Sequence, residues 1–254
     1  MFKNYIKIAF RNLFRKKLYS FLNIAGLAIG LACSILLLFY IQDELSFDRF
    51  HDKAGRIHRV VHASGGTSER DYAVSAPALA TRMKDECPEV EKIVRLYPDD
   101  TLMLSSGERK FYENEVIMAD PALLEIFDFP MIKGDPATAL SDLNSIVLTE
   151  SVAEKYFGAA NPVGMTLRLN NDSDLTVTGV IADIPANSHL RFDFIRPFEL
   201  LRGRGRDLDS WDDISFYTYA LLSDKASVAA VDEKLLGLAA REQVEGEPCY
   251  LQAL

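Results

Sequence analysis

The sequence predicts an α+β protein with one N-terminal transmembrane helix followed by an extracytoplasmic domain. Three observations predict this fold class. The chain has 254 residues, of which 48% are apolar and 26% charged, with 14 Gly and 10 Pro, a composition typical of folded domains and unlike that of disordered or collagen-like chains. Residues 18–41 form a run of 24 residues without a charge. Strand-like and helix-like patterns then alternate up to the C-terminus.

Charge is divided unevenly along the chain. Residues 1–17 contain six lysines and arginines and no acid, whereas the remainder has 22 basic against 37 acidic residues. Nucleic-acid binding needs a basic face that replaces phosphate counterions. An acidic body of this kind argues against a nucleic-acid partner.

Residues 1–17 have a pattern typical of a cytoplasmic amphipathic helix. Their basic residues recur every four positions and so share one helix face: Lys3, Lys7, Arg11 and Arg15. Such a helix suits the cytoplasmic membrane surface or a partner beneath it. A basic flank that only sets topology is an equal alternative on this pattern alone.

The uncharged run predicts a membrane span over residues 18–43. At about 1.5 Å per residue the run reaches about 36 Å, enough to cross a hydrocarbon layer of about 30 Å. A cleavable signal is the less favoured alternative, because its apolar region has about 7–15 residues and this run continues through residues 35–39. Basic residues precede the span and Asp43, Glu44 and Asp48 follow it. The positive-inside rule therefore predicts a cytoplasmic N-terminus, with residues 44–254 outside.

One face of the predicted span carries small and polar residues at three- and four-residue spacing: Asn23, Gly26, Gly30 and Ser34. Two glycines four residues apart form a small-xxx-small motif, which lets a second helix approach closely. Such motifs also arise by chance in Gly- and Ala-rich spans. If the motif is used, its partner helix comes from a second copy, from another subunit, or from a continuation beyond Leu254.

The start of the outer domain has the pattern strand, helix, strand. Residues 56–63 are β-rich, and residues 91–97 return as a strand. The helix between them is expected to begin with Ser75 as N-cap and Pro77 in its first turn, and to end before Pro88.

The same order recurs near the C-terminus. Residues 215–222 predict a strand, 226–242 a helix and 248–254 a strand. Two strand–helix–strand units can close into one split ferredoxin-like layer of strands under two helices. We therefore expect a single discontinuous subdomain.

A β-rich insertion separates the two units. The strand candidates are residues 101–105, 110–118, 145–149, 165–169 and 175–181, with a turn at 170–172. Two short helices are predicted: residues 121–127 with Asp120 as N-cap, and residues 151–157 with Gly158 as the C-terminal stop.

Known catalytic motifs are absent from the sequence. Without G-x-x-x-x-G-K-[ST] the chain lacks the usual phosphate-binding loop, so an ATPase, if required, is another polypeptide. No G-x-S-x-G, H-E-x-x-H or C-x-x-C occurs either. We expect a protein that is not an enzyme, with no catalytic residue, resident cofactor or metal.

Two sets of residues have both a chemical and a structural interpretation, and in each set the structural one is favoured. His58 and His62 would share a strand face and could bind a metal with His51 or an acid, but a surface or packing role is favoured. Cys87 and Cys249 would both lie outside the membrane, where a disulfide is permitted, yet their pairing is the less favoured alternative.

Two charged stretches near residue 205 also have alternatives. The acidic set could clamp calcium but lacks EF-hand spacing, so a solvated face is favoured; it comprises Asp207, Asp209, Asp212 and Asp213. The basic set is interleaved with glycine and reads as a flexible linker, with contact to a partner or an anionic head group as the alternative; it comprises Arg202, Arg204 and Arg206.

Four long strings in this order resemble ABC-transporter permeases of the MacB-like and FtsX-like group. They are KNYIKIAFRNLFRKKLYSFLNIAGLAIGLACSILLLFYIQDELSFDRFHDKAGRIHRVV, VLTESVAEKYFGAANPVGMTL, LTVTGVIADIPANSHLRFDF and WDDISFYTYALL. The resemblance runs nearly end to end. It implies a "porter" subdomain over residues 44–98 and 212–254, an inserted "sabre" subdomain over 99–211, and three further C-terminal spans. On this basis the sequence is expected to be the N-terminal part of a longer permease.

The resemblance implies a subunit that does mechanical work in the inner membrane. Motion of a partner ATPase, which would bind ATP and Mg²⁺, would pass through a dimer of permeases to the outer domains, with residues 19–50 as a stiff lever. The expected activity is export of peptide, antibiotic or lipid-like cargo, and a periplasmic adaptor is a further possible partner. The alternative is an FtsX-like regulatory permease, which activates a cell-wall hydrolase without transport.

Overall fold

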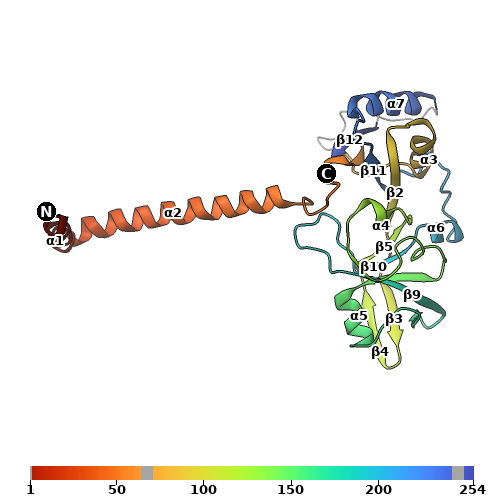
Figure 1. Cartoon of the computed structure of the whole chain (residues 1–254), viewed down its shortest axis with the longest axis horizontal. Helices are drawn as coiled ribbons and strands as arrows, with labels where there is room; N and C mark the ends of the chain where they lie inside the picture. The colour runs from red at the N-terminus through yellow and green to blue at the C-terminus, as the bar shows by residue number, and fades with distance from the viewer. Residues whose placement is uncertain (1, 64–70, 242–248) are drawn as a thin grey trace. The chain divides into compact units, whose positions relative to one another are not determined.

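The computed structural model describes residues 2–63, 71–241 and 249–254 (Figure 1). The chain divides into two compact units, the first ending at Phe47 and the second beginning at Asp48.

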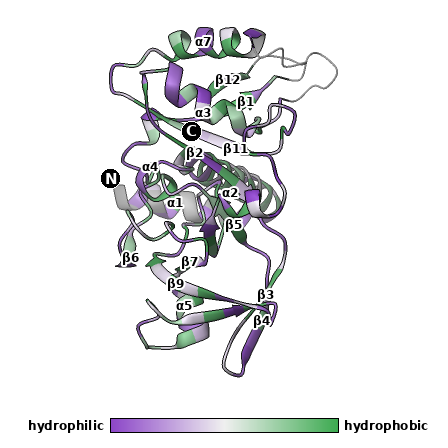
Figure 2. Cartoon of the chain, turned by 90° about the vertical axis from the view of Figure 1, so that its right-hand side faces the viewer, coloured by the Kyte–Doolittle hydropathy of each residue, from purple (hydrophilic) through white to green (hydrophobic). Residues whose placement is uncertain are grey.

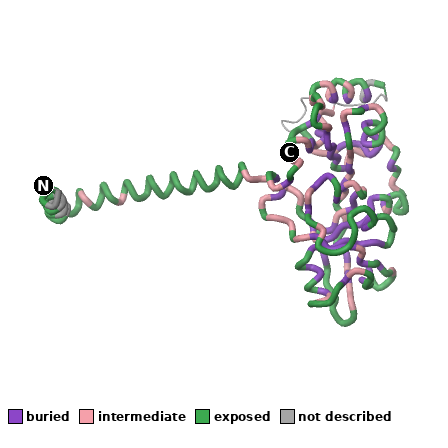
Figure 3. The backbone as a smooth tube through the Cα atoms, viewed as in Figure 1, coloured by how far each residue is buried: buried purple, intermediate pink, exposed green. Residues whose placement is uncertain are grey.

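The first unit consists of two helices, α1 (Phe2–Arg15) and α2 (Lys17–Ser46). The 30 residues of α2 correspond to about 45 Å at 1.5 Å per residue. No residue of α2 is buried in the structure, and the helix is exposed along nearly its whole length (Figure 3). Among the described residues α2 is the one helix long and apolar enough to cross a membrane. Such an apolar surface is stable only when lipid or other apolar surface covers it.

The continuous helix ends at Ser46, three residues beyond the predicted end of the span and before the expected lever end at Phe50. Asp48 has a φ of 56°, in the left-handed region that breaks a right-handed helix. The expected uninterrupted lever over residues 19–50 was therefore wrong at its C-terminal end.

The second unit begins with a split ferredoxin-like layer, as predicted. After the short 3₁₀ helix η1 (Ala54–Arg56), two strand–helix–strand units follow: β1 (Ile57–His62), α3 (Pro77–Glu86), β2 (Val90–Pro98), and β11 (Tyr217–Leu222), α7 (Val228–Arg241), β12 (Cys249–Ala253). The strand order is β12-β1-β11-β2, and every neighbouring pair is antiparallel. One core cluster joins both helices to the strands through Val60, Met83, Leu222 and Leu235.

The remaining strands extend this layer into one sheet of twelve described strands (Figure 1). From β2 the order continues β5-β10-β7-β9-β8-β3-β4, and β6 pairs with β9. Their bounds are β3 (Leu102–Ser106), β4 (Arg109–Glu113), β5 (Val116–Ala119), β6 (Met131–Gly134), β7 (Ser145–Thr149), β8 (Thr166–Leu169), β9 (Ser173–Ile181) and β10 (Phe194–Pro197). Three helices accompany them: α4 (Leu123–Ile126), α5 (Glu150–Phe157) and α6 (Leu200–Gly203).

Position in the sheet matches the character of each strand. All five residues of β7 are buried, because β7 is paired on both sides, with β9 and β10, and its apolar run suits a strand covered on both faces. By contrast β4 lies at the end of the sheet, exposes four of its five residues, and is largely hydrophilic (Figure 2). Charged side chains on an end strand discourage pairing with another chain.

Several local predictions were wrong. The strand expected at residues 110–118 is two strands, β4 and β5, that lie far apart in the sheet. Helix α3 starts after Ala76, and Ser75 does not cap it, because its hydroxyl donates to Thr218 Oγ1 at 2.9 Å. Asp120 does not cap α4 with its side chain, because its carboxylate accepts from Arg95.

Other local predictions were confirmed. The turn between β8 and β9 has positive φ at Asn170 and Asn171, 50° and 58°, which is the geometry of a tight hairpin turn. Helix α5 stops at Gly158, whose φ is 64°. Strands β6 and β10 were not predicted. The subdomain boundaries at residues 99 and 211 stay predictions.

Candidate functional site

The predicted helix-packing residues lie together on α2. Asn23, Gly26, Gly30 and Ser34 are all exposed, and their spacing places them on one face of the helix. A Cβ added at either glycine would meet nothing within 4 Å, so both positions are open to a neighbour. Ser34 donates its hydroxyl to the Gly30 carbonyl at 2.9 Å, which satisfies that polar group inside the helix. Use of this face for packing stays a prediction.

The predicted basic face lies on α1. Lys7, Arg11 and Arg15 are exposed on this helix. Lys3 belongs to the same helix, but its side chain lies outside the described part of the structure. The role of this face in topology or partner binding stays a prediction.

Asp48, the first residue of the second unit, is held firmly by a distant loop. Its carboxylate accepts from the backbone N–H of His189 at 3.0 Å and from the Ser188 hydroxyl at 3.3 Å, and its own N–H donates to Asn187 O at 2.9 Å. Asp48 and Ser188 are buried. Since buried polar groups are costly unless paired, these contacts fix the backbone two residues after the end of α2.

His189 extends this contact to the ferredoxin-like sheet. Its Nδ1 lies 2.8 Å from the Asp48 carboxylate, at ion-pair distance though not aligned as a hydrogen bond, and its Nε2 lies 2.7 Å from the Tyr219 hydroxyl. Tyr219 is a buried residue of β11. Burial raises the pKa of its hydroxyl, although Arg59 opposes the shift. A polar chain Asp48–His189–Tyr219 therefore joins the start of the unit to a central strand. We call it the entry chain.

A buried histidine, His51, lies beside the entry chain. His51 is only 3% exposed and packs against the rings of Phe50, Phe127 and Phe129. Its Nδ1 accepts from the Asp128 N–H at 3.1 Å, so the neutral ring carries its proton on Nε2. Lys53 Nζ lies 2.8 Å from the Asp128 carboxylate. Burial lowers the pKa of His51, and the nearby carboxylates of Asp128 and Asp48 only partly oppose it.

Sequence reasoning missed the entry chain. Asp48 entered the sequence analysis only as one of the acids after the span, and His189 and Tyr219 were not singled out. The available signal was local: aspartate is one of the few residues that tolerate a positive φ, and Asp48 lies seven residues after Ile41, the end of the uncharged run. Its partner is 141 positions away.

The arginines expected in a flexible linker are instead bound by acids. Arg204 donates to the Asp99 carboxylate at 2.6 and 3.2 Å, and Arg196 of β10 donates to the same carboxylate at 3.1 Å. The Asp99 side chain is 1% exposed. Arg202 pairs with Asp209 and Glu199, and Arg206 pairs with Asp213. The prediction of a loose basic loop was wrong, and the acidic set is in part its ion-pair partner.

Among the described residues, the histidines and cysteines considered above form neither a metal site nor a disulfide. His58 Nδ1 lies 3.1 Å from Arg56 O, and His62 Nδ1 lies 3.4 Å from Cys249 Sγ. No three His, Cys, Asp or Glu side chains in the described ranges gather as metal ligands. Cys87 is buried, Cys249 half-buried, and both are free.

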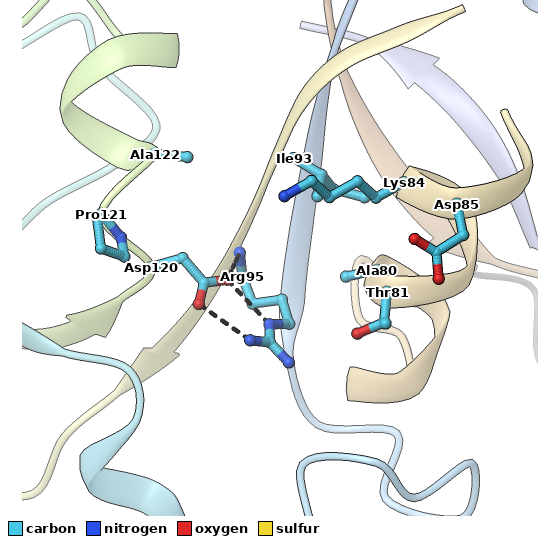
Figure 4. A pocket seen from close by; sticks show the side chains of 9 residues that line it. All are labelled: Ala80, Thr81, Lys84, Asp85, Ile93, Arg95, Asp120, Pro121 and Ala122. Carbon is cyan, nitrogen blue, oxygen red and sulfur yellow. Dashed lines mark hydrogen bonds and ion pairs between the residues drawn. The ribbon is translucent and has the colours of Figure 1, made fainter. Parts of the chain in front are cut away.

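A pocket of about 440 Å³ lies between α3, β2 and the segment before α4 (Figure 4). Arg95 and Asp120 form a two-pronged pair there, with distances of 2.9 and 3.0 Å. Arg95 also lies over the Phe198 ring, 4.3 Å from its centroid. This guanidinium is therefore already paired and stacked, and the two basic residues of the lining, Lys84 and Arg95, are matched by two acids, Asp85 and Asp120.

Comparison with known proteins finds a matching family and solved structures that share this architecture. The sequence matches the family model of the MacB-like periplasmic core domain over residues 20–238. None of the curated proteins matches it. A domain of a Porphyromonas gingivalis protein described as a permease has a TM-score of 0.69 and 24% identity, with 80% of this chain and 92% of that one covered.

Two further solved structures have the same fold. The periplasmic region of MacB from Actinobacillus actinomycetemcomitans has a TM-score of 0.58 and 13% identity, covering 79% of this chain and 89% of that one. The extracellular domain of the ABC-type transporter YknZ from Gram-positive bacteria has a TM-score of 0.55 and 13% identity, covering 77% and 99%. At these identities the structural matches show a shared fold.

Proposed function

The chain belongs to the family of MacB-like periplasmic core domains, and from this membership we propose that it is a permease subunit of an ABC transporter. It couples ATP hydrolysis by a separate subunit to a conformational change of residues 48–254, which we call the outer unit. The work done by that change is export of a peptide, antibiotic or lipid-like cargo.

The entry chain is the observation that carries the proposal. A mechanical subunit needs a stiff connection wherever the chain passes from a moving helix into a folded domain, because a slack linker absorbs motion as local disorder. Here one residue, Phe47, separates the last residue of α2 from a buried aspartate. Through His189 and Tyr219 that aspartate is bonded to a strand paired on both sides, with β1 and β2.

The charge pattern supports an orientation in the inner membrane with the N-terminus in the cytoplasm. Residues 1–17 hold six basic residues and no acid, and acids follow the span, which is the distribution that the positive-inside rule describes. In this orientation α1 lies on the cytoplasmic side, where the ATPase acts, and residues 48–254 lie outside.

The partners and cofactors follow from the same proposal. An ATPase subunit supplies bound ATP and Mg²⁺, because this sequence has no phosphate-binding loop. A second permease copy packs on the face with Gly26 and Gly30, and a periplasmic adaptor is a further candidate partner. This chain contributes mechanical coupling and no catalytic residue.

The test is to reconstitute the full chain in nanodiscs together with candidate ABC ATPase subunits from the same organism. A fluorescent label at Glu108→Cys, in a Cys33→Ser, Cys249→Ser background that keeps only the buried Cys87, reports motion of residues 48–254. We expect co-purification, ATP hydrolysis and an ATP-dependent change of the label signal. Failure of any ATPase to bind, or hydrolysis without change in the outer unit, would contradict the proposal.

Asp48→Ala tests the coupling itself. The variant removes the acceptor of the Ser188 and His189 bonds, so we expect ATP hydrolysis to continue while the label response falls several-fold. Asp52→Ala is the matched control, because Asp52 is exposed and no partner is found for it among the described residues.

Cargo export by the same particles would separate the transporter from a regulatory permease, which responds to ATP but moves no cargo.

A further inference from the structure

A second pocket, of about 370 Å³, opens on the face of the ferredoxin-like layer opposite α3 and α7. Its floor comes from Leu96 of β2, Ile117 of β5 and Tyr219 of β11, and the loop with Leu190 and Phe192 forms a wall. Strands β11, β2 and β5 are consecutive in the sheet, which brings these residues together. The volume is in the lower range for small-molecule sites.

The charge of this pocket is opposite to that of the outer unit. The charged residues in its lining are Arg59 and Arg191, with no acid, although acids outnumber bases in the chain after residue 17. Asp48 is not part of the lining, and its carboxylate already accepts from the Ser188 hydroxyl and the His189 backbone N–H. The pocket beside α3, by comparison, is lined by Lys84 and Arg95 together with Asp85 and Asp120.

Neither arginine has a carboxylate partner in the part of the chain that the structure describes. Arg59 Nη2 donates to the side-chain oxygen of Gln252 at 2.6 Å, and Arg191 Nη2 donates to the Ala186 carbonyl at 2.7 Å. A guanidinium carries five N–H donors, so each retains donors for a ligand. Unneutralised arginines over apolar and aromatic walls match a group that is anionic at one end and apolar at the other.

We propose that this pocket binds an amphipathic anion, a single phosphate or carboxylate on an apolar body. The anionic group lies between Arg59 and Arg191, and the apolar body lies against Leu96, Ile117 and Phe192. The site goes beyond the proposed function and does not depend on it, since binding requires neither ATP nor a partner subunit. The same chemistry is offered by a soluble amphiphile and by a lipid head group with its first methylenes.

The test uses hexyl phosphate as probe, with the full chain held in zwitterionic phosphatidylcholine nanodiscs and binding measured by equilibrium dialysis against radiolabelled compound. We expect one saturable site on the wild type. Hexanol and inorganic phosphate, which each lack one half of the probe, should bind at least tenfold more weakly. If hexanol binds as tightly as hexyl phosphate, the pocket does not recognise the anionic group. If inorganic phosphate binds as tightly, the pocket does not recognise the apolar body. Either result would overturn the proposal.

Two variants locate the site. Arg59→Gln and Arg191→Gln each remove a charge-assisted contact, and we expect the dissociation constant to rise about tenfold or more in each. Arg191 is exposed and donates to a backbone carbonyl, so its variant stays informative if Arg59→Gln misfolds. Arg168→Gln changes net charge equally, far along the sheet on β8, and should bind as the wild type does. No binding, or unchanged binding in Arg191→Gln, overturns the proposal.

Nanodiscs of anionic phosphatidylglycerol identify the source of the ligand. If the bilayer supplies the head group, anionic lipid competes and hexyl phosphate binding falls in these particles. If the ligand is a soluble amphiphile, binding is the same in both lipids. Both results are consistent with the site and assign its occupant.

Discussion

At the scale of single residues, long-range polar contacts shape this protein more than any motif does. Asp99 meets Arg204 across 105 positions, and Asp48 meets His189 across 141. Hydrophobic periodicity reports which face of an element is buried, but it carries no information on which distant charge a carboxylate will meet. For this reason the sequence predicted a linker at residues 202–206 where the structure has an ion-pair network.

The buried His51 makes stability depend on pH. Its folded-state pKa is lowered, so the unfolded chain binds more protons below its ordinary value of about 6.5, and the stability contributed at neutral pH is lost as pH falls. We expect the free energy of unfolding to fall between pH 7 and pH 5. The His51 contribution to this slope cannot exceed about 1.4 kcal/mol per pH unit. Urea unfolding followed by Trp211 fluorescence measures it.

His51→Phe isolates this contribution. The variant loses the acceptor of the Asp128 N–H, so it is less stable by about 1 kcal/mol at pH 7. Because it no longer titrates, the difference between variant and wild type should shrink or reverse at pH 5. A difference that is constant from pH 7 to pH 5 would show that His51 does not titrate over this range.

Asp99 is expected to be one of the most sensitive charges in the outer unit. Asp99→Asn keeps the shape but leaves the buried Arg196 without a countercharge; burial already lowers the pKa of this guanidinium, with Asp99 opposing. Breaking one partner of a buried ion pair costs about 3–5 kcal/mol. Asp100→Asn, at the exposed neighbouring position, serves as control and should change the unfolding midpoint little. Equal midpoints for the two variants would show that Arg196 is adequately solvated.

At the scale of elements, the sequence predicted helices and strands correctly where the hydrophobic periodicity extends over a long segment. Both strand–helix–strand units, β7 and the stop of α5 were predicted close to their observed bounds. Strands β6 (MIKG) and β10 (FIRP) were missed because neither alternates apolar and polar residues, unlike the equally short β8 (TLRL). In β10 the pattern is also misleading, since Arg196 and Pro197 are both buried there. Within residues 110–118 the two residues between β4 and β5 send the strands to different parts of the sheet.

The small-residue face of α2 yields a prediction at the same scale. Gly26→Leu with Gly30→Leu adds bulk where the glycines leave open space, so a second helix can no longer approach closely. We expect cross-linking between copies in nanodiscs to fall several-fold. Ala28→Leu with Ala32→Leu adds bulk at the same four-residue spacing on the other side of the helix, and should leave cross-linking unchanged. Equal losses in both pairs would indicate a general effect of bulk.

At the scale of the whole molecule, the two predicted subdomains share one sheet. The pairing of β2 with β5 carries the hydrogen-bond ladder from the ferredoxin-like layer into the insertion, and residues 48–254 form one compact unit. One core cluster also spans both, with Val94 and Tyr219 from the layer and Phe127 and Ile195 from the insertion. Sequence patterns predicted the split layer and its insertion, but not that a continuous ladder would join them.

A shared ladder and core predict that residues 48–254 unfold as one cooperative unit. Leu148→Ala empties a fully buried position of β7 in the insertion, at a cost of about 2–5 kcal/mol. Trp211, the single tryptophan, packs against the core of the ferredoxin-like layer. We therefore expect its fluorescence transition in urea to shift with the circular-dichroism transition, and by the same amount. Leu143→Ala, at a half-exposed position, should shift neither. If Leu148→Ala lowers the circular-dichroism midpoint and leaves the Trp211 midpoint in place, the insertion unfolds independently and the sheet is only a geometric continuity.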